Sequence, residues 1–275
     1  MKRSLMLGVL GAWVTAPLWA GVVFEVETTD HGASPPRVET HQMSAEGRML
    51  KMEIDSGGRG KHGDVIFRGD RREMVIVDHD EKSVFVMDEQ TLRELAAQIG
   101  SAMSQIEEAL KNVPESQRAM VEEMMKKRMP QQNATKTPAV EVRKTGDRAD
   151  QAGYPCVKYE IVTDGSVTSE LWVTDWDSVE GGEEAVGAFR DMANFASEMV
   201  KALASAGGPL VSMTGLDGSG VAQWSQIEGF PVVTRQLDNG RLESESVLRG
   251  SERRALDPSD FEPPAGYKRQ QMGPR

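Results

Sequence analysis

The chain of 275 residues contains one cysteine, Cys156, which cannot form a disulfide bond within the chain. The fold must therefore be stabilised by its apolar core rather than by covalent cross-links. Cys156 lies in Gly153–Tyr159, a stretch typical of a strand. Free cysteines in such positions are usually buried, and we interpret Cys156 as a core residue rather than as a reactive or intermolecular thiol.

Catalytic signatures are also absent from the sequence. There is no Gly-x-Ser-x-Gly nucleophile elbow, and Gly218-Ser219-Gly220 lacks its spacing. No glycine-rich phosphate loop occurs. Acid pairs such as Glu107-Glu108 fall on expected helix surfaces, where solvation explains them. We therefore expect no catalytic residue, no cofactor and no enzymatic activity, and a hydrolase assembled from distant residues is the least favoured alternative.

The four histidines, His31, His41, His62 and His79, have no spacing that is typical of metal ligands. Asp78-His79-Asp80 stands where a hairpin turn is expected, and a turn explains its composition. The sequence therefore predicts no metal site.

Positive charge is in deficit, because 32 Lys and Arg residues face 43 Asp and Glu residues. Nucleic-acid sites depend on clustered Lys and Arg, so a net charge of −11 argues against a nucleic acid as partner.

The N-terminus has the pattern of a secretory signal peptide. Met1-Lys2-Arg3 is basic, Leu5–Leu18 is apolar without charge, and Ala20 is a small residue suited to cleavage. A membrane span needs roughly 20 apolar residues, so we expect residues 1–20 to be removed and no transmembrane segment to remain. The mature chain would then lie in the periplasm.

Period-two alternation and turn residues predict antiparallel strands over much of the remaining chain. Asp164-Gly165 and Asn239-Gly240 are tight-turn signals of hairpins. The expected strands are Val22–Glu27, Leu50–Ile54, Asp64–Arg68, Glu73–Val77, Ser83–Met87, Val140–Lys144, Cys156–Thr163, Val167–Val173, Gly220–Ile227, Phe230–Leu237 and Arg241–Leu248.

Apolar residues at spacings of three and four predict helices in two places. A helical hairpin is expected over residues 88–129, with Asp88 as N-cap and Pro114 between its two helices. A further helix is expected over Glu183–Ala206, ended by Gly207-Gly208-Pro209. The sequence thus predicts one α+β domain over residues 21–268, a curved antiparallel sheet capped by helices, and a disordered tail over 269–275.

Four segments carry a family resemblance: Ala152–Tyr159, Leu171–Asp175, Gly229–Val232 and Asp257–Lys268. Together they resemble an uncharacterised exported bacterial family, the domain-of-unknown-function family four-four-one-two. That family is similar to the periplasmic lipoprotein carrier and its outer-membrane receptor. The resemblance implies an unclosed antiparallel barrel capped by helices around an apolar cavity, and it transfers no catalytic residue.

Many of the 16 methionines fall on the expected helices, and flexible thioether side chains suit a variable apolar ligand such as an acyl chain. A methionine stripe at helical spacing is also typical of an ordinary core. A lipid or other apolar molecule held under the helices is the leading interpretation, and an envelope protein docked on the hairpin 88–129 is the alternative. The candidate ligand-binding residues are Met103, Met120, Met124, Met125, Met192 and Met199.

Overall fold

The computed structural model describes residues 21–55, 62–111, 139–205 and 226–270. These form one sheet of twelve strands and two long helices, confirming the α+β class. The strands are β1 (Gly21–Asp30), β2 (Arg37–Glu46), β3 (Met49–Asp55), β4 (His62–Arg68), β5 (Glu73–Asp78), β6 (Ser83–Met87), β7 (Val140–Gln151), β8 (Tyr154–Thr163), β9 (Ser166–Thr174), β10 (Phe230–Asp238), β11 (Arg241–Arg254) and β12 (Lys268–Gln270). The helices are α1 (Glu89–Lys111) and α3 (Gly182–Ser205), with short 3-10 turns η1 (Trp176–Ser178) and η3 (Pro258–Phe261).

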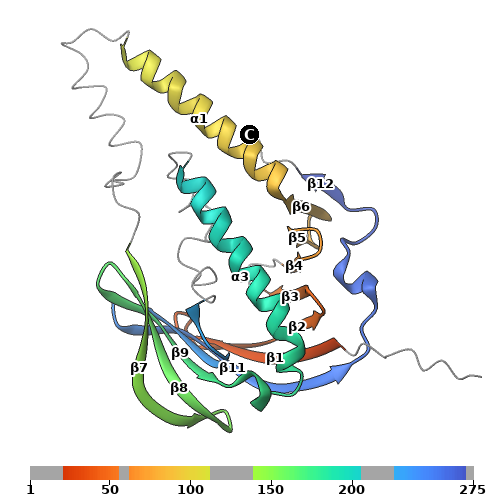
Figure 1. The fold of residues 1–275 in the computed structure, drawn as a ribbon, viewed down its shortest axis with the longest axis vertical. Coiled ribbons are helices and arrows are strands. Elements are labelled where there is room, and N and C mark those ends of the chain that lie inside the picture. The colour runs from red at the N-terminus through yellow and green to blue at the C-terminus, as the bar shows by residue number, and fades with distance from the viewer. Residues whose placement is uncertain (1–20, 56–61, 112–138, 206–225, 271–275) are drawn as a thin grey trace, which may run out of the picture.

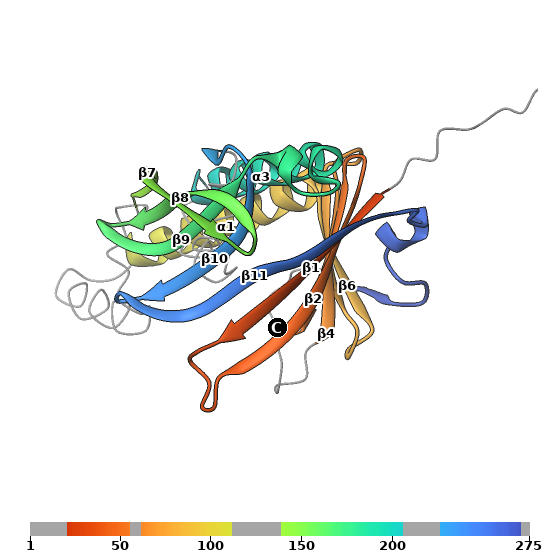
Figure 2. The same cartoon turned by 90° about the horizontal axis from the view of Figure 1, so that it is seen from below.

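The sheet is curved and does not close within the described residues. Its order is β12-β6-β5-β4-β3-β2-β1-β11-β10-β9-β8-β7, so β12 and β7 form its two edges. Each neighbouring pair is antiparallel except β12 and β6, which run parallel. Figures 1 and 2 show the strands bending around the side on which the helices lie.

Both hairpin signals are confirmed. The two residues of each turn, Asp164-Gly165 and Asn239-Gly240, have positive φ, the conformation that the tight turn requires. By contrast, no strand was predicted at β2. Of the expected strand Gly220–Ile227, only residues 226–227 are described, and they lie outside any strand.

The described helices lie where the apolar spacing predicts them. Asp88 caps α1, because its carboxylate accepts a 2.7 Å hydrogen bond from the backbone N–H of Thr91. This hydrogen bond holds the pKa of Asp88 below its usual value. Residues 112–129, the second half of the expected hairpin, lie outside the described residues, as do residues 1–20.

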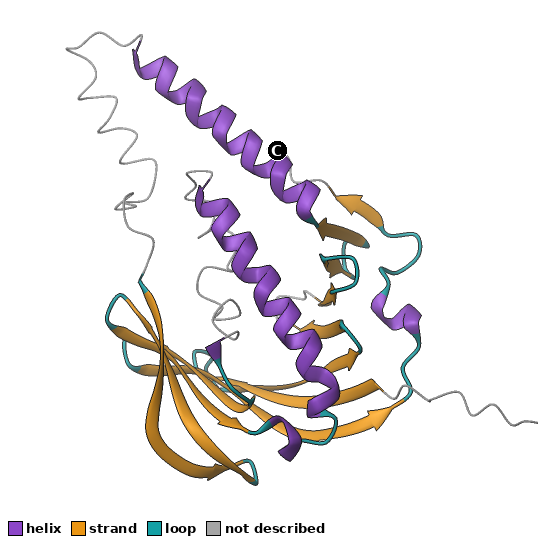
Figure 3. Cartoon of the chain, in the orientation of Figure 1, coloured by secondary structure: helices purple, strands orange, loops and turns teal. Residues whose placement is uncertain are grey.

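Helix α3 crosses one face of the sheet over β1, β2 and β3, and α1 packs beside it near β6 (Figure 3). We call the face under α3 the inner face. A Cβ at Gly181, which has positive φ, would lie 2.4 Å from Val22, and one at Gly182 would lie 2.1 Å from the carbonyl oxygen of Trp176. These two glycines therefore let the first turn of α3 lie directly on β1 and η1.

The outer face of β4, β5 and β6 is covered by the chain after β11. Phe261 of η3 is fully buried there, in contact with the cluster of Ile66, Val75, Val77, Val84 and Val86. The segment ends in β12, so Arg269 and Gln270 belong to a strand, which corrects the start of the tail predicted to be disordered.

Candidate ligand-binding site

The inner face carries a covered row of apolar side chains across β1 to β6. Strand register places these residues opposite one another, and each is buried against α3 or its neighbours in the main core cluster. This row is Val22, Ala45, Leu50, Phe67, Met74 and Met87. It is the ordinary core of a helix packed on a sheet.

A second apolar row runs beside the first, two residues away from it on each strand. It contains Phe24, Met43, Met52, Val65, Ile76 and Phe85. Phe24 is fully buried, whereas Ile76 is 38% exposed and the other four are half-buried. We call these six residues the open row, because five of them are partly exposed.

An apolar pocket of about 240 Å³ lies where the open row meets α3. Its floor comes from five neighbouring strands, β3, β2, β1, β11 and β10, and its wall on the helix side is Phe189. The lining residues are Val26, His41, Gln42, Met43, Met52, Glu53, Phe189, Phe230, Pro231, Val232, Thr234, Ser246 and Leu248.

Aromatic rings form the boundary between this pocket and the core. Phe230 packs on Phe24 with ring centroids 4.9 Å apart, and Phe189 contacts both rings at 5.7 and 6.3 Å. Trp176 of η1 adds a tilted contact to Phe189 at 5.6 Å and an edge contact to Phe230 at 5.5 Å. The cluster of four rings, in which Phe189 and Phe230 each contact the other three, gives the pocket a rigid wall.

Ion pairs hold α3 over the inner face. Arg253 of β11 donates to Glu184 at 2.8 Å, which holds the pKa of Glu184 below its usual value. Arg48 donates to Asp191 at 2.5 Å from the turn between β2 and β3. Because these pairs are exposed, each is worth no more than about 1 kcal/mol, and the apolar contacts dominate the attachment of α3.

None of the six predicted ligand-binding methionines is found lining the apolar pocket in the part of the chain that the structure describes. Met192 and Met199 of α3 have no exposed surface and lie in the core cluster, and neither lines the apolar pocket. Met103 belongs to α1, but its side chain lies outside the described part, as do residues Met120, Met124 and Met125. The pocket is instead lined by two strand methionines, Met43 and Met52, which the helix-based reasoning missed.

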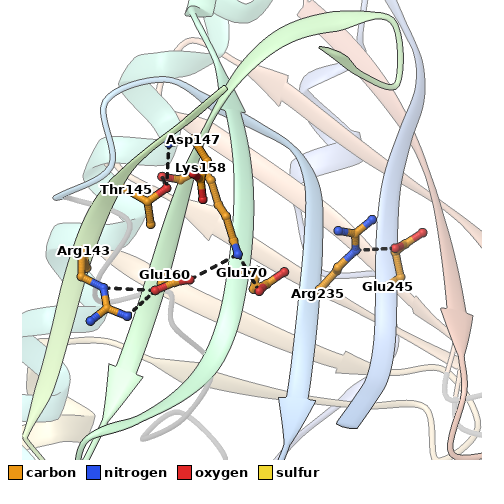
Figure 4. Close-up of polar contacts among 8 residues, drawn as sticks. All are labelled: Arg143, Thr145, Asp147, Lys158, Glu160, Glu170, Arg235 and Glu245. Carbon is orange, nitrogen blue, oxygen red and sulfur yellow. Dashed lines mark hydrogen bonds and ion pairs between the residues drawn. The ribbon is translucent and has the colours of Figure 1, made fainter. Parts of the chain in front are cut away.

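The strands β7 to β11 carry charged side chains that form ion pairs with one another. Across β7 to β11, Arg143 donates to Glu160, Lys158 bridges Glu160 and Glu170 at 3.2 and 2.7 Å, and Arg235 donates to Glu245 at 2.6 Å (Figure 4). The hydrogen bond from Arg143 holds the pKa of Glu160 below its usual value. Since these charges satisfy one another, this area offers little to a ligand.

The Asp78-His79-Asp80 segment forms the turn between β5 and β6. Asp78 accepts a 2.7 Å hydrogen bond from the N–H of Glu81, as a turn residue does. His79 lies between Asp64, at 3.0 Å, and the hydroxyl of Tyr267, at 2.9 Å. Within the described ranges, no group of three or more His, Cys, Asp or Glu side chains is arranged to hold a metal ion.

Comparison with known protein families assigns the chain to one of them. A family model described as Domain of unknown function (DUF4412) matches residues 87–267. The chain belongs to this family. The match covers α1, α3 and the strands from β7 to β11, and the strands β1 to β6 that carry the open row precede almost all of it. No curated protein sequence matches the chain.

Two solved structures are distantly similar to the chain. An uncharacterized conserved protein from Thermus thermophilus is 8% identical, with a TM-score of 0.45, and the alignment covers 93% of this chain and 92% of that one. PNGF-II is also 8% identical, with a TM-score of 0.40 over 92% of this chain and 31% of that one. The chain therefore spans about a third of the length of PNGF-II.

In the part of the chain that the structure describes, no helix is both long and apolar enough to cross a membrane.

Proposed function

We propose that this protein is an exported, periplasmic binding protein that holds a lipid or another apolar molecule between α3 and the inner face of the sheet. The signal-peptide pattern of residues 1–20 supports export. In this proposal the protein resembles the lipoprotein carrier in architecture, binds its ligand without chemical change and uses no cofactor.

The observation that carries the proposal is the open row beside the apolar pocket. A sheet that only needed a core would bury its second apolar row as it buries the first. Here the row reaches Ile76, which is 38% exposed, through half-buried side chains such as Val65. Partly exposed apolar side chains that lie side by side next to a pocket are typical of a ligand-binding groove.

The driving force would be the removal of apolar surface from water, about 25 cal/mol per Å². Met43 and Met52 suit acyl chains of differing length, because thioether side chains adapt their shape at little cost.

The test is to purify the protein from cells that express the full chain, and to examine it by native mass spectrometry with lipid extraction. We expect a stoichiometric apolar adduct. The variant Met52→Glu places a charge in the pocket and should abolish the adduct. Met49→Glu is the matched control, because Met49 is a half-buried methionine on the same strand that packs against the outer-face cluster instead.

A clean mass without any adduct, together with no uptake of an added fluorescent fatty acid, would contradict the proposal. That result would favour the alternative, in which the segment 88–129 binds another envelope protein.

A further inference from the structure

A second hollow adjoins the apolar pocket and carries three charged side chains among apolar ones, and we call it the polar hollow. It has a volume of about 330 Å³ and shares two residues, Phe189 and Pro231, with the apolar pocket. Its other lining residues are Asp175, Trp176, Val186, Arg190, Ile227, Glu228 and Gly229. By itself this hollow lies at the lower end of the roughly 300–1,000 Å³ that is usual for a small-molecule site, and the adjoining apolar pocket enlarges the available space.

Two opposite charges line the polar hollow, and neither has an ion-pair partner in the described part of the chain. Among the described residues, the guanidinium of Arg190 forms no ion pair, and the carboxylate of Asp175 forms none and does not cap η1. The two groups also do not pair with each other, although they share the hollow. The third charge, Glu228, is already matched by Lys144 at 3.4 Å.

We propose that the polar hollow binds a zwitterionic phospholipid headgroup, of the phosphoethanolamine class, while the acyl chain of the same lipid lies in the apolar pocket. This inference rests on the proposed function. The planar guanidinium of Arg190 suits a phosphate, because its N–H groups match two phosphate oxygens. The carboxylate of Asp175 accepts hydrogen bonds from the ammonium group.

Charge complementarity selects this headgroup over others. An anionic headgroup without an ammonium group would pair with Arg190 but leave Asp175 facing a like charge. An uncharged headgroup would leave both groups unmatched. Because Asp175 and Arg190 are exposed, each contact should change affinity by only about two- to fivefold.

The experiment compares three lipids with identical acyl chains: a phosphatidylethanolamine, a phosphatidylglycerol and a diacylglycerol. Each is titrated into the purified full-chain protein against a bound fluorescent fatty acid. The wild type should prefer the phosphatidylethanolamine. Arg190→Gln should weaken both phospholipids about two- to fivefold, whereas Asp175→Asn should weaken the phosphatidylethanolamine alone.

Two variants outside the hollow serve as matched controls. Asp177→Asn changes the other acid of η1, and Arg241→Gln changes an exposed arginine of the β10–β11 hairpin. Neither residue lines the hollow, so both variants should keep the wild-type order of affinities.

Equal affinity for all three lipids, unchanged by Arg190→Gln and Asp175→Asn, would refute the headgroup site. The proposal that the apolar pocket binds an acyl chain would not be affected. Failure of the wild type to bind either the fatty acid or any lipid would overturn both proposals.

Discussion

Truncation of Ile76 in the open row should weaken binding of an apolar ligand without harming the fold. Complete burial of an isoleucine side chain is worth about 1.5–3 kcal/mol. Since Ile76 is 38% exposed, a ligand that covers it recovers about a third of this free energy, or about 0.5–1 kcal/mol. Ile76→Ala should therefore raise the Kd for a fluorescent fatty acid about two- to fivefold.

The matched control for this variant is Leu242→Ala. Leu242 is 37% exposed, nearly the same as Ile76, but it lies at the start of β11 and belongs to neither the open row nor the pocket. Both proteins are titrated with the same fatty acid after their urea midpoints have been compared. The reasoning is refuted if Ile76→Ala leaves the Kd unchanged, or if Leu242→Ala raises it by the same factor.

Three further results are expected. Phe261→Ala should lower the free energy of unfolding by about 3–5 kcal/mol in urea titrations, because Phe261 is fully buried against the outer face, and a loss below about 1 kcal/mol would contradict its role as an anchor. Burial raises the pKa of the Cys156 thiol, so alkylation at neutral pH should be slow in the folded protein and fast in urea; rapid labelling of the folded protein would disprove this. The pKa of Glu160 is lower in the folded than in the unfolded chain, chiefly through its hydrogen bond from Arg143. The stability that ionised Glu160 contributes is therefore complete above the unfolded pKa and is lost as pH falls through the folded pKa. Glu160→Gln should flatten the acid side of a curve of unfolding free energy against pH, and an unchanged curve would count against the pairing.

The helices and tight turns could be predicted because their signals are local. The three-and-four spacing that begins at Leu92 marks α1, and positive φ at Asn239-Gly240 is encoded by those two residues. Strand β2 escaped prediction because most of Arg37–Glu46 is polar, with apolar side chains only at Val38, Met43 and Ala45. Its place is fixed by pairing with β1 and β3 rather than by its own pattern.

The candidate site depended on information that is not local. Alternation along β3 shows that Leu50 and Met52 share a face, but not which strands lie beside them. The pairing of β1 with β11 brings Leu248 next to Val26, more than two hundred residues away in the chain. The methionine spacing on the helices predicted Met192 as a ligand-binding residue, but Met192 is a buried core residue. The methionines that line the pocket, Met43 and Met52, lie on strands.

The most direct test of the account is photo-crosslinking of the purified protein with a diazirine-labelled fatty acid, followed by mapping of the modified peptides by mass spectrometry. The account predicts labels on the inner face of β2, β3 and β5, at Met43, Met52 and Ile76, and competition by unlabelled fatty acid. Labels confined to exposed apolar residues elsewhere, such as Val38 and Leu242, or labelling that unlabelled fatty acid does not reduce, would contradict it.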